Sequence, residues 1–380
     1  MTAGRRLRVV VVAPLRFPIR RPHAGGLESA VWSEVAALRA RGHEVTFIGV
    51  RGSDFVERGS VFELPELRWP RWASPDDERY PPSHATRSIP ALRRALEAIS
   101  ARPGRYDVVS NHCLDALPVE LAPRLGVPMI TTLHTPVDAS VAAAANRSGA
   151  AGSRFLSVSE YTRRTWADAG VESEVLLNGI DPTAWPAGRG GEDLVWFGRI
   201  VAEKAPHLAV DVARRLGRRL VIAGRVGDPA YAERVLAPLL GRDVRHVGPL
   251  EPTRLAALVG RSAAAVSTPA WAEPFGLVAP EALMTGTPVV SFAVGGVPEI
   301  AQASVGMQVV AAGDLAAMAD RVDGLIRQSE LDRGFRSTIR ASALARFSLE
   351  ARVSRLEGHF DALLAGSPVL DAGRVDELTS

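Results

Sequence analysis

Residues 8–50 decide the fold, and they read RVVVVAPLRFPIRRPHAGGLESAVWSEVAALRARGHEVTFIGV. The β-branched run at 8–14 is typical of a strand that is buried on both faces. The next apolar residues lie three and four positions apart, at Leu27, Val31, Val35 and Leu38. This spacing predicts a helix over 27–41, which Gly42 closes. Residues 44–50 predict a second strand, so the segment forms a parallel βαβ unit.

The same alternation of strand and helix continues along the chain in two series. Further strands are expected at 106–110, 128–133, 154–158, 194–197, 220–223, 244–247, 264–267 and 288–292. A stretch rich in Pro and Gly at 178–191 separates the series. The predicted fold class is therefore α/β, with two Rossmann-like, doubly wound parallel-sheet domains facing across a cleft.

The expected boundaries follow from this pattern. An N-terminal domain covers 1–180, and a C-terminal domain covers 191–348. A last helix at 349–366 is expected to cross back to the first domain. Residues 51–88 show no periodicity and are interpreted as a surface insertion.

Composition excludes several classes of function. The net charge is only +3 over 380 residues and no helix is densely basic, so nucleic acid is not an expected partner. No apolar run reaches the roughly 20 residues that span a bilayer. A single cysteine, Cys113, rules out an internal disulfide. We expect a cytoplasmic protein. Membrane contact through the loop 68–72 remains open, and the oligomeric state is undetermined.

Lys204 is the only lysine in the chain, whereas every other strong cation is arginine. A general preference for arginine explains the background but not this exception. Lysine offers a compact ammonium charge that arginine does not reproduce. Gly198, Arg199 and Lys204 follow the strand at 194–197 and precede a helix, an arrangement that suits a diphosphate. Two solvated surface cations are the plain alternative.

Two glutamates follow the strand at 264–267. Glu273 lies in the loop before a helix, and Glu281 lies about one turn inside it. Carboxylates in these places can accept hydrogen bonds from two separate polyol groups, while N–H groups of the first helical turn can meet phosphate. A capping role for Glu273 and a surface position for Glu281 are the alternative.

These motifs resemble the retaining glycosyltransferases of family GT4, which have the GT-B fold. The resemblance rests on Gly198, Arg199, Lys204, Glu273, Pro274, Phe275, Gly276, Leu277, Glu281, Gly286, Gly295, Gly296, Pro298 and Glu299. In the first half, Gly25, Gly26, His112 and His134 also match the family's pattern. Two features depart from it: Ala205 stands where members often have glycine, and residues 52–88 have no counterpart, so acceptor specificity cannot be carried over.

The resemblance implies that the domain at 1–180 binds the acceptor and that the domain at 191–348 binds the nucleotide sugar. It also implies a role for each matching residue. Arg199 and Lys204 would hold the donor diphosphate, and Glu281 the ribose hydroxyls. Glu273 would bind the transferred sugar, and His112 would reach the reacting centre, whereas His134 is left outside the catalytic set. The implied catalytic residues are therefore Arg199, Lys204, Glu273 and His112. The implied donor-binding residues are Gly25, Gly26, Arg199, Lys204, Glu273, Phe275, Gly276, Leu277, Val278 and Glu281.

The expected chemistry is transfer of a sugar from a nucleotide-diphosphate sugar to a small-molecule, natural-product or lipid-linked acceptor. No Asp-x-Asp sequence is present, so no metal or other cofactor is expected, and two cations would replace the metal. No carboxylate nucleophile is evident opposite the leaving group, which favours same-face substitution with retention. Two alternatives remain: a sugar-nucleotide epimerase on the same scaffold, and a non-catalytic protein that binds a sugar nucleotide.

Overall fold

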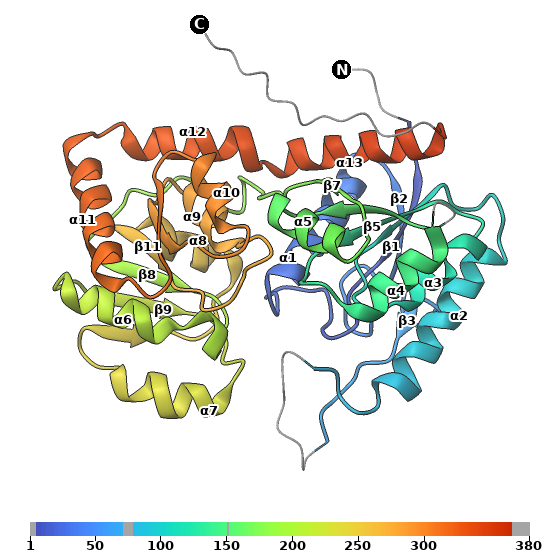
Figure 1. Cartoon of the computed structure of the whole chain (residues 1–380), viewed down its shortest axis with the longest axis horizontal. Helices are drawn as coiled ribbons and strands as arrows, with labels where there is room; N and C mark the ends of the chain where they lie inside the picture. The colour runs from blue at the N-terminus through green and yellow to red at the C-terminus, as the bar shows by residue number, and fades with distance from the viewer. Residues whose placement is uncertain (1–4, 71–78, 150–151, 367–380) are drawn as a thin grey trace, which may run out of the picture.

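The computed structural model describes residues 5–70, 79–149 and 152–366. They form two α/β units, each built on a fully parallel sheet, as predicted (Figure 1). The first sheet has seven strands in the order β3-β2-β1-β4-β5-β6-β7, and the second has six in the order β10-β9-β8-β11-β12-β13. In both, the first strand of the unit lies inside the sheet, which is the doubly wound arrangement.

The N-terminal unit follows the predicted βαβ start closely. Its strands are β1 (Arg8–Val12), β2 (Glu44–Val50), β3 (Glu63–Leu64), β4 (Val108–Asn111), β5 (Met129–Leu133), β6 (Arg154–Ser157) and β7 (Glu174–Val175). Its helices are α1 (Gly26–Ala40), α2 (Ile89–Ser100), α3 (Leu117–Leu121), α4 (Ala139–Ser148) and α5 (Glu160–Asp168). The segment expected as an insertion supplies the edge strand β3 and the π-helical turn at His84–Ser88. Arg71 and Trp72 of the suggested membrane loop lie outside the described residues.

The C-terminal unit repeats the plan with shorter strands. These are β8 (Leu194–Phe197), β9 (Leu220–Ala223), β10 (Val244–His246), β11 (Ala264–Ser267), β12 (Val289–Phe292) and β13 (Met307–Val310). The helices are α6 (Pro206–Arg215), α7 (Pro229–Tyr231), α8 (Pro252–Gly260), α9 (Val278–Met284), α10 (Val297–Gln302), α11 (Leu315–Leu331) and α12 (Phe335–Phe347). Strand β13 was not among the predicted strands.

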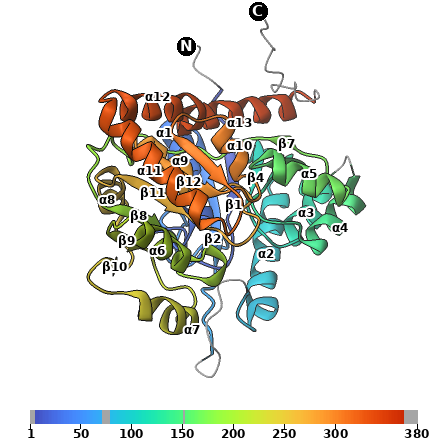
Figure 2. The same cartoon turned by 60° about the vertical axis from the view of Figure 1, so that its left-hand side comes forward.

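The last helix, α13 (Leu349–Leu364), follows α12 with only Ser348 between them, and the two run along one side of both units (Figures 1 and 2). Val353, Leu356 and Phe360 are fully buried in the same core as Val31 and Val35 of α1. The helix that ends the second unit is therefore part of the core of the first. Among the described residues no helix combines the length and apolar character needed to cross a bilayer.

Candidate functional site

Lys204 and Glu273 form an ion pair between the ends of two neighbouring strands. Lys204 ends a short 3-10 turn (Ala202–Lys204) after β8, and Glu273 lies in the loop after β11, the strand that pairs with β8. The Lys204 ammonium donates to Oε1 of Glu273, and it lies 5.0 Å from the ring centroid of Trp271. The side chains remain 22% and 10% exposed, so both groups stay within reach of a ligand.

The turn that carries Lys204 shows why family members often have glycine at the position of Ala205. Ala205 adopts the left-handed conformation, with φ 46° and ψ 52°, which glycine adopts without steric cost. It is the sole non-glycine residue with positive φ among those the structure describes. Pro206 then begins α6, in keeping with proline's preference for the first helical position. The conformation of Ala205 thus sets the direction of the backbone directly after Lys204.

Arg199 forms an ion pair with Glu203, a residue that was not predicted from the sequence. Its Nη2 donates to Oε1 of Glu203 at 2.7 Å, and these side chains are 24% and 18% exposed. Glu203 belongs to the same turn as Lys204, and its carbonyl accepts from the Ala270 N–H at 2.7 Å. Two half-buried ion pairs, each of one cation and one glutamate, therefore lie on this edge of the sheet.

The loop of Gly295 and Gly296 packs against the backbone of Glu273. The Gly296 N–H donates to the Glu273 carbonyl at 2.8 Å. A Cβ added at Gly295 would lie 2.1 Å from the same carbonyl oxygen, and φ there is 57°. Only glycine fits at this approach of two backbones. The Gly-Gly motif is therefore a packing requirement of the loop that carries Glu273.

Glu281 lies in the first turn of α9 and has no ion-pair or hydrogen-bond partner for its carboxyl group among the described residues. The side chain is only partly exposed, and burial raises the pKa of Glu281 to about 8. At pH 7 the group is therefore mostly protonated. A ligand hydroxyl that donates to the carboxylate would favour the ionised form, so binding and deprotonation are coupled.

The segment 275–278 meets the N-terminal unit at Gly26. A Cβ added at Gly26 would lie 2.8 Å from Cδ1 of Leu277, so these two predicted donor-binding residues are in contact. Gly25 has an extended backbone at the start of α1. Gly276 has φ 91°. The Phe275 side chain is buried against Phe347, with ring centroids 6.4 Å apart, so only its backbone can serve a ligand.

Several contacts bring the carboxyl-end loops of the two sheets together. The Ser159 hydroxyl donates to the Pro274 carbonyl at 2.5 Å. Glu299 accepts from the N–H groups of Glu160 and Tyr161 at 2.8 and 2.6 Å, at the start of α5. The carboxylate of one unit thus caps a helix of the other. The strand ends of the two units therefore face each other, as expected for the cleft.

Arg225 and Glu28 extend the charged region and were not predicted. Nε of Arg225, which follows β9, donates to the Ala24 carbonyl at 2.7 Å, just before Gly25. Glu28 is 6% exposed; burial raises its pKa, while Arg225, Arg199 and Arg16 act to lower it. A buried carboxylate among arginines of both units is a mark of a functional site. The spacing of the sequence motifs did not predict that Glu28 is buried among arginines.

The two histidines differ in exposure, and His112 is the more deeply buried of the two. His112 is fully buried, and its two ring nitrogens lie 2.9 Å from Glu34 Oε1 and 2.9 Å from Nε2 of His134. In this arrangement His112 has no ring nitrogen left for a ligand. His134, which was left outside the catalytic set, follows β5 directly and is partly exposed. Any role of His112 at the reacting centre remains a prediction.

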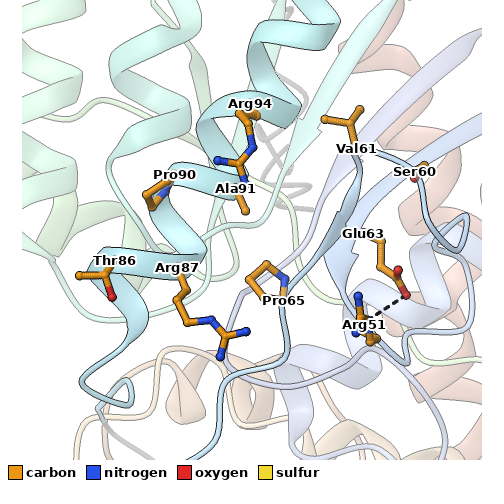
Figure 3. A pocket seen from close by; sticks show the side chains of 10 residues that line it. All are labelled: Arg51, Ser60, Val61, Glu63, Pro65, Thr86, Arg87, Pro90, Ala91 and Arg94. Atoms are coloured by element: carbon orange, nitrogen blue, oxygen red, sulfur yellow. Dashed lines mark ion pairs between the residues drawn. The ribbon is translucent and has the colours of Figure 1, made fainter.

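A separate pocket of about 410 Å³ lies on the N-terminal unit (Figure 3). Residues on α2 and the turn before it line one side, and the segment around β3 lines the other. Arg51, which follows β2, pairs with Glu63 at 3.5 Å, whereas Arg87 and Arg94 form no ion pair with another described residue. The lining is therefore positively charged. None of the predicted site residues belongs to it.

Two facing α/β units, each built on a parallel sheet, form the arrangement of the GT-B fold class. Solved structures support this fold: sucrose-phosphate synthase from Thermosynechococcus elongatus superposes with a TM-score of 0.73 at 19% identity, covering 95% of this chain and 100% of that one. HepE of Anabaena, crystallised with UDP and glucose, gives 0.72 at 15% identity, covering 94% of this chain and 100% of that one.

The family follows from the sequence models. The model for glycosyl transferases group 1 matches residues 184–341, and the model for Glycosyltransferase Family 4 matches residues 24–184. Together they take in most of the chain. The chain belongs to the GT4 family of glycosyltransferases.

Curated relatives are similar over part of their length. A glycogen synthase of Mycobacterium tuberculosis is 35% identical over 232 residues, and the match covers 52% of this chain and 55% of the relative. A D-inositol 3-phosphate glycosyltransferase of Mycobacterium bovis is 32% identical over 303 residues, and the match covers 69% of this chain and 62% of the relative. The chain thus spans a little over half the length of these relatives.

Proposed function

We propose that this protein transfers a sugar from a nucleotide-diphosphate sugar to an acceptor with retention of anomeric configuration. The observation that carries the proposal is the Lys204–Glu273 pair between adjacent strand ends, beside the Arg199–Glu203 pair. Lys204 and Arg199 would neutralise the leaving diphosphate, while Glu273 would accept hydrogen bonds from the sugar. Glu281 would accept from the ribose hydroxyls.

The proposed reaction places charge where the site already holds the opposite charge. Breaking the bond between the anomeric carbon and the diphosphate oxygen leaves negative charge on the diphosphate and positive charge on the sugar. Ammonium and guanidinium groups that are fixed before the reaction stabilise the first, and the Glu273 carboxylate favours the second. The acceptor hydroxyl would attack from the face of the leaving group and lose its proton to the diphosphate oxygen. Independence from metal remains a prediction.

Three experiments test this function. A thermal-shift panel with UDP, GDP, ADP and TDP identifies the donor base, because a ligand that binds only the folded protein raises its apparent stability. Incubation of the matching nucleotide sugar without acceptor separates transfer from epimerisation, since an epimerase isomerises the donor. Proton NMR of the product then reports the anomeric configuration. An inverted product would refute the same-face mechanism.

Glu281 gives a pH-dependent prediction. If ribose hydroxyls donate to its carboxylate, binding favours the ionised form of a group whose pKa is about 8. The affinity for the matching nucleoside diphosphate should therefore rise as the pH is raised from 7 to 9, by up to about tenfold. Calorimetric titration at several pH values measures this. Glu281→Gln, which cannot ionise, should remove the Glu281 share of the pH dependence; an identical pH profile in both proteins would contradict the assignment.

We further propose that the acceptor carries a negatively charged group that binds the pocket of Arg51, Arg87 and Arg94. The pocket follows the carboxyl ends of β2 and β3, on the unit assigned to the acceptor, and two of its arginines pair with no described acid. A phosphorylated polyol is named as the acceptor of one relative, which is consistent with this charge. Arginine also suits bidentate contact with phosphate.

The acceptor proposal has a direct test. With the donor fixed, D-inositol 3-phosphate should be used better than inositol, and replacing both Arg87 and Arg94 with alanine should raise the KM for the phosphorylated acceptor about tenfold or more. Arg333→Ala, a change at an exposed arginine in the turn before α12, is the matched control. Equal use of both acceptors by all three proteins would show that the pocket does not bind the acceptor.

A further inference from the structure

Two hydroxyl groups of the N-terminal unit bind the loop that carries Glu273 in the C-terminal unit. Ser159 and Thr162 donate from their hydroxyls to the Pro274 carbonyl, at 2.5 and 3.1 Å. Pro274 directly follows Glu273 in the chain, and Ser159 and Thr162 are each 1% exposed. A carbonyl oxygen has two lone pairs, so both hydroxyls can donate to it at the same time. The backbone next to Glu273 is therefore held by the other unit through both lone pairs of this carbonyl.

The start of α5 directs the Ser159 hydroxyl towards Pro274. Ser159 caps α5, and its oxygen accepts from the Thr162 N–H at 3.0 Å. That oxygen also lies 3.0 Å from the Thr162 hydroxyl, but the Pro274 carbonyl is nearer. A Cβ added at Gly296 would lie 2.6 Å from the Pro274 carbonyl oxygen and 2.9 Å from the Ser159 hydroxyl oxygen. Glycine at this position thus allows the two units to approach closely enough for the contact.

A second contact between the units holds the other side of Glu273. The Glu273 carbonyl accepts from the Gly296 N–H at 2.8 Å. Three residues further on, the Glu299 carboxylate of α10 accepts from the N–H groups of Glu160 and Tyr161 in α5. Helices α5 and α10 accordingly lie side by side (Figures 1 and 2). The backbone of Glu273 is therefore connected to the start of α5 on both sides.

The loop around Glu273 depends on such contacts for its conformation. It spans residues 268–277, between β11 and α9, and contains no helix or strand. A reacting group in such a segment is held in place by the hydrogen bonds of the backbone around it, and a displacement of about 1 Å is enough to lower the rate of a reaction strongly. The hydroxyls on Pro274 therefore influence where the Glu273 carboxylate lies relative to Lys204.

We propose that Ser159 and Thr162 are positioning residues: by holding the Pro274 carbonyl they place the carboxylate of Glu273 against the Lys204 ammonium and the transferred sugar. The inference rests on the proposed function for the role of Glu273 towards the sugar. The placement of the carboxylate beside Lys204 does not depend on that function. The N-terminal unit thereby helps to build the donor site through the backbone of a loop of the C-terminal unit.

Thr162→Val removes one of the two hydroxyls and keeps both the shape of the side chain and the Ser159 cap. With the donor that the thermal-shift panel selects, kcat should fall about fivefold in this variant, and about thirtyfold in Ser159→Ala/Thr162→Val. Thr162→Ser keeps the hydroxyl and should retain the wild-type kcat. The affinity for the nucleoside diphosphate without sugar should not fall in any of these proteins, because the hydroxyls act on the carboxylate that faces the sugar.

Thr165→Val is the matched control. Thr165 lies on the same helix, and its hydroxyl donates within α5 to the Thr162 carbonyl at 3.0 Å. The same chemical change at this position alters α5 without removing a hydrogen bond to Pro274. This variant should therefore retain the wild-type kcat.

A spectroscopic measurement follows the ion pair without any reaction. Because Lys204 is the only lysine in the chain, protein labelled with 13C at lysine gives one Cε signal. Glu273→Gln shows where this signal lies without the ion pair. The signal should move towards that position in Ser159→Ala/Thr162→Val, and part of the way in Thr162→Val. It should stay at the wild-type position in Thr165→Val and in Thr162→Ser.

Each outcome decides the proposal. An unmoved Lys204 signal in the folded Ser159→Ala/Thr162→Val protein overturns it, and so does an equal loss of kcat in Thr162→Val and Thr165→Val. If the double variant fails to fold, Thr162→Val alone decides in the same way. If the signals move as expected but the wild-type protein transfers no sugar, the placement of Glu273 stands and the proposed function falls. If the wild-type protein transfers sugar and the signals do not move, the proposed function stands and the positioning role falls.

Discussion

Replacing Lys204 with alanine is expected to lower kcat/KM for the sugar donor by at least about a hundredfold. The Lys204 side chain is 22% exposed at the strand edge, where its ammonium pairs with Glu273 and lies near Trp271. A fixed charge in a partly dehydrated site stabilises a leaving diphosphate far more than a solvated one does. Lys204→Arg should recover little, because the larger planar group does not replace a compact ammonium.

The control for this experiment is Arg333→Ala, which removes a positive charge from an exposed turn. It should retain wild-type kcat/KM. Near-normal turnover of a folded Lys204→Ala protein would show that the leaving group is stabilised elsewhere.

Glu273→Gln should also reduce kcat strongly, by about a hundredfold, but with a different effect on binding. The amide keeps the shape of the side chain and loses the charge that favours a positively charged sugar in the transition state. At the same time the change releases Lys204 from its only ionic partner among the residues that the structure describes. The affinity for a nucleoside diphosphate without sugar should therefore stay the same or increase.

Steady-state kinetics and calorimetric titration of the same Glu273→Gln preparation measure the two effects. Glu251→Gln, at the exposed residue before α8, is the matched control and should change neither quantity. Weaker diphosphate binding together with normal kcat would reverse the roles proposed for Lys204 and Glu273.

The fold was predictable because most of its strands are apolar runs with clear boundaries. The run at 8–14 contains β1, and residues 44–50 and 264–267 coincide with β2 and β11. The strands that were not predicted lie at sheet edges, where burial places a weaker constraint on which residues can form the strand. β13 includes the polar Gln308 at an edge of the second sheet, and β3 and β7 have two residues each. Such strands are held by pairing with a neighbour rather than by their own composition.

The part of the candidate site that could be predicted consists of residues that stand out in the sequence. The sole lysine and the two glutamates after β11 pointed to this edge of the sheet, and the structure brings Lys204 and Glu273 into contact. The burial of His112 could not be inferred, because it depends on Glu34 and Arg352, which are 78 and 240 positions away in sequence. Glu203 and Glu28 were missed because a single acidic residue near a turn carries no pattern.

The most direct measurement of the central claim is calorimetric titration of the wild-type and Lys204→Ala proteins with the nucleoside diphosphate selected by the thermal-shift panel. If the diphosphate lies against the Lys204 ammonium, the alanine variant should bind at least about tenfold more weakly, because a charge-assisted contact is lost. Equal dissociation constants for two folded proteins would contradict the account.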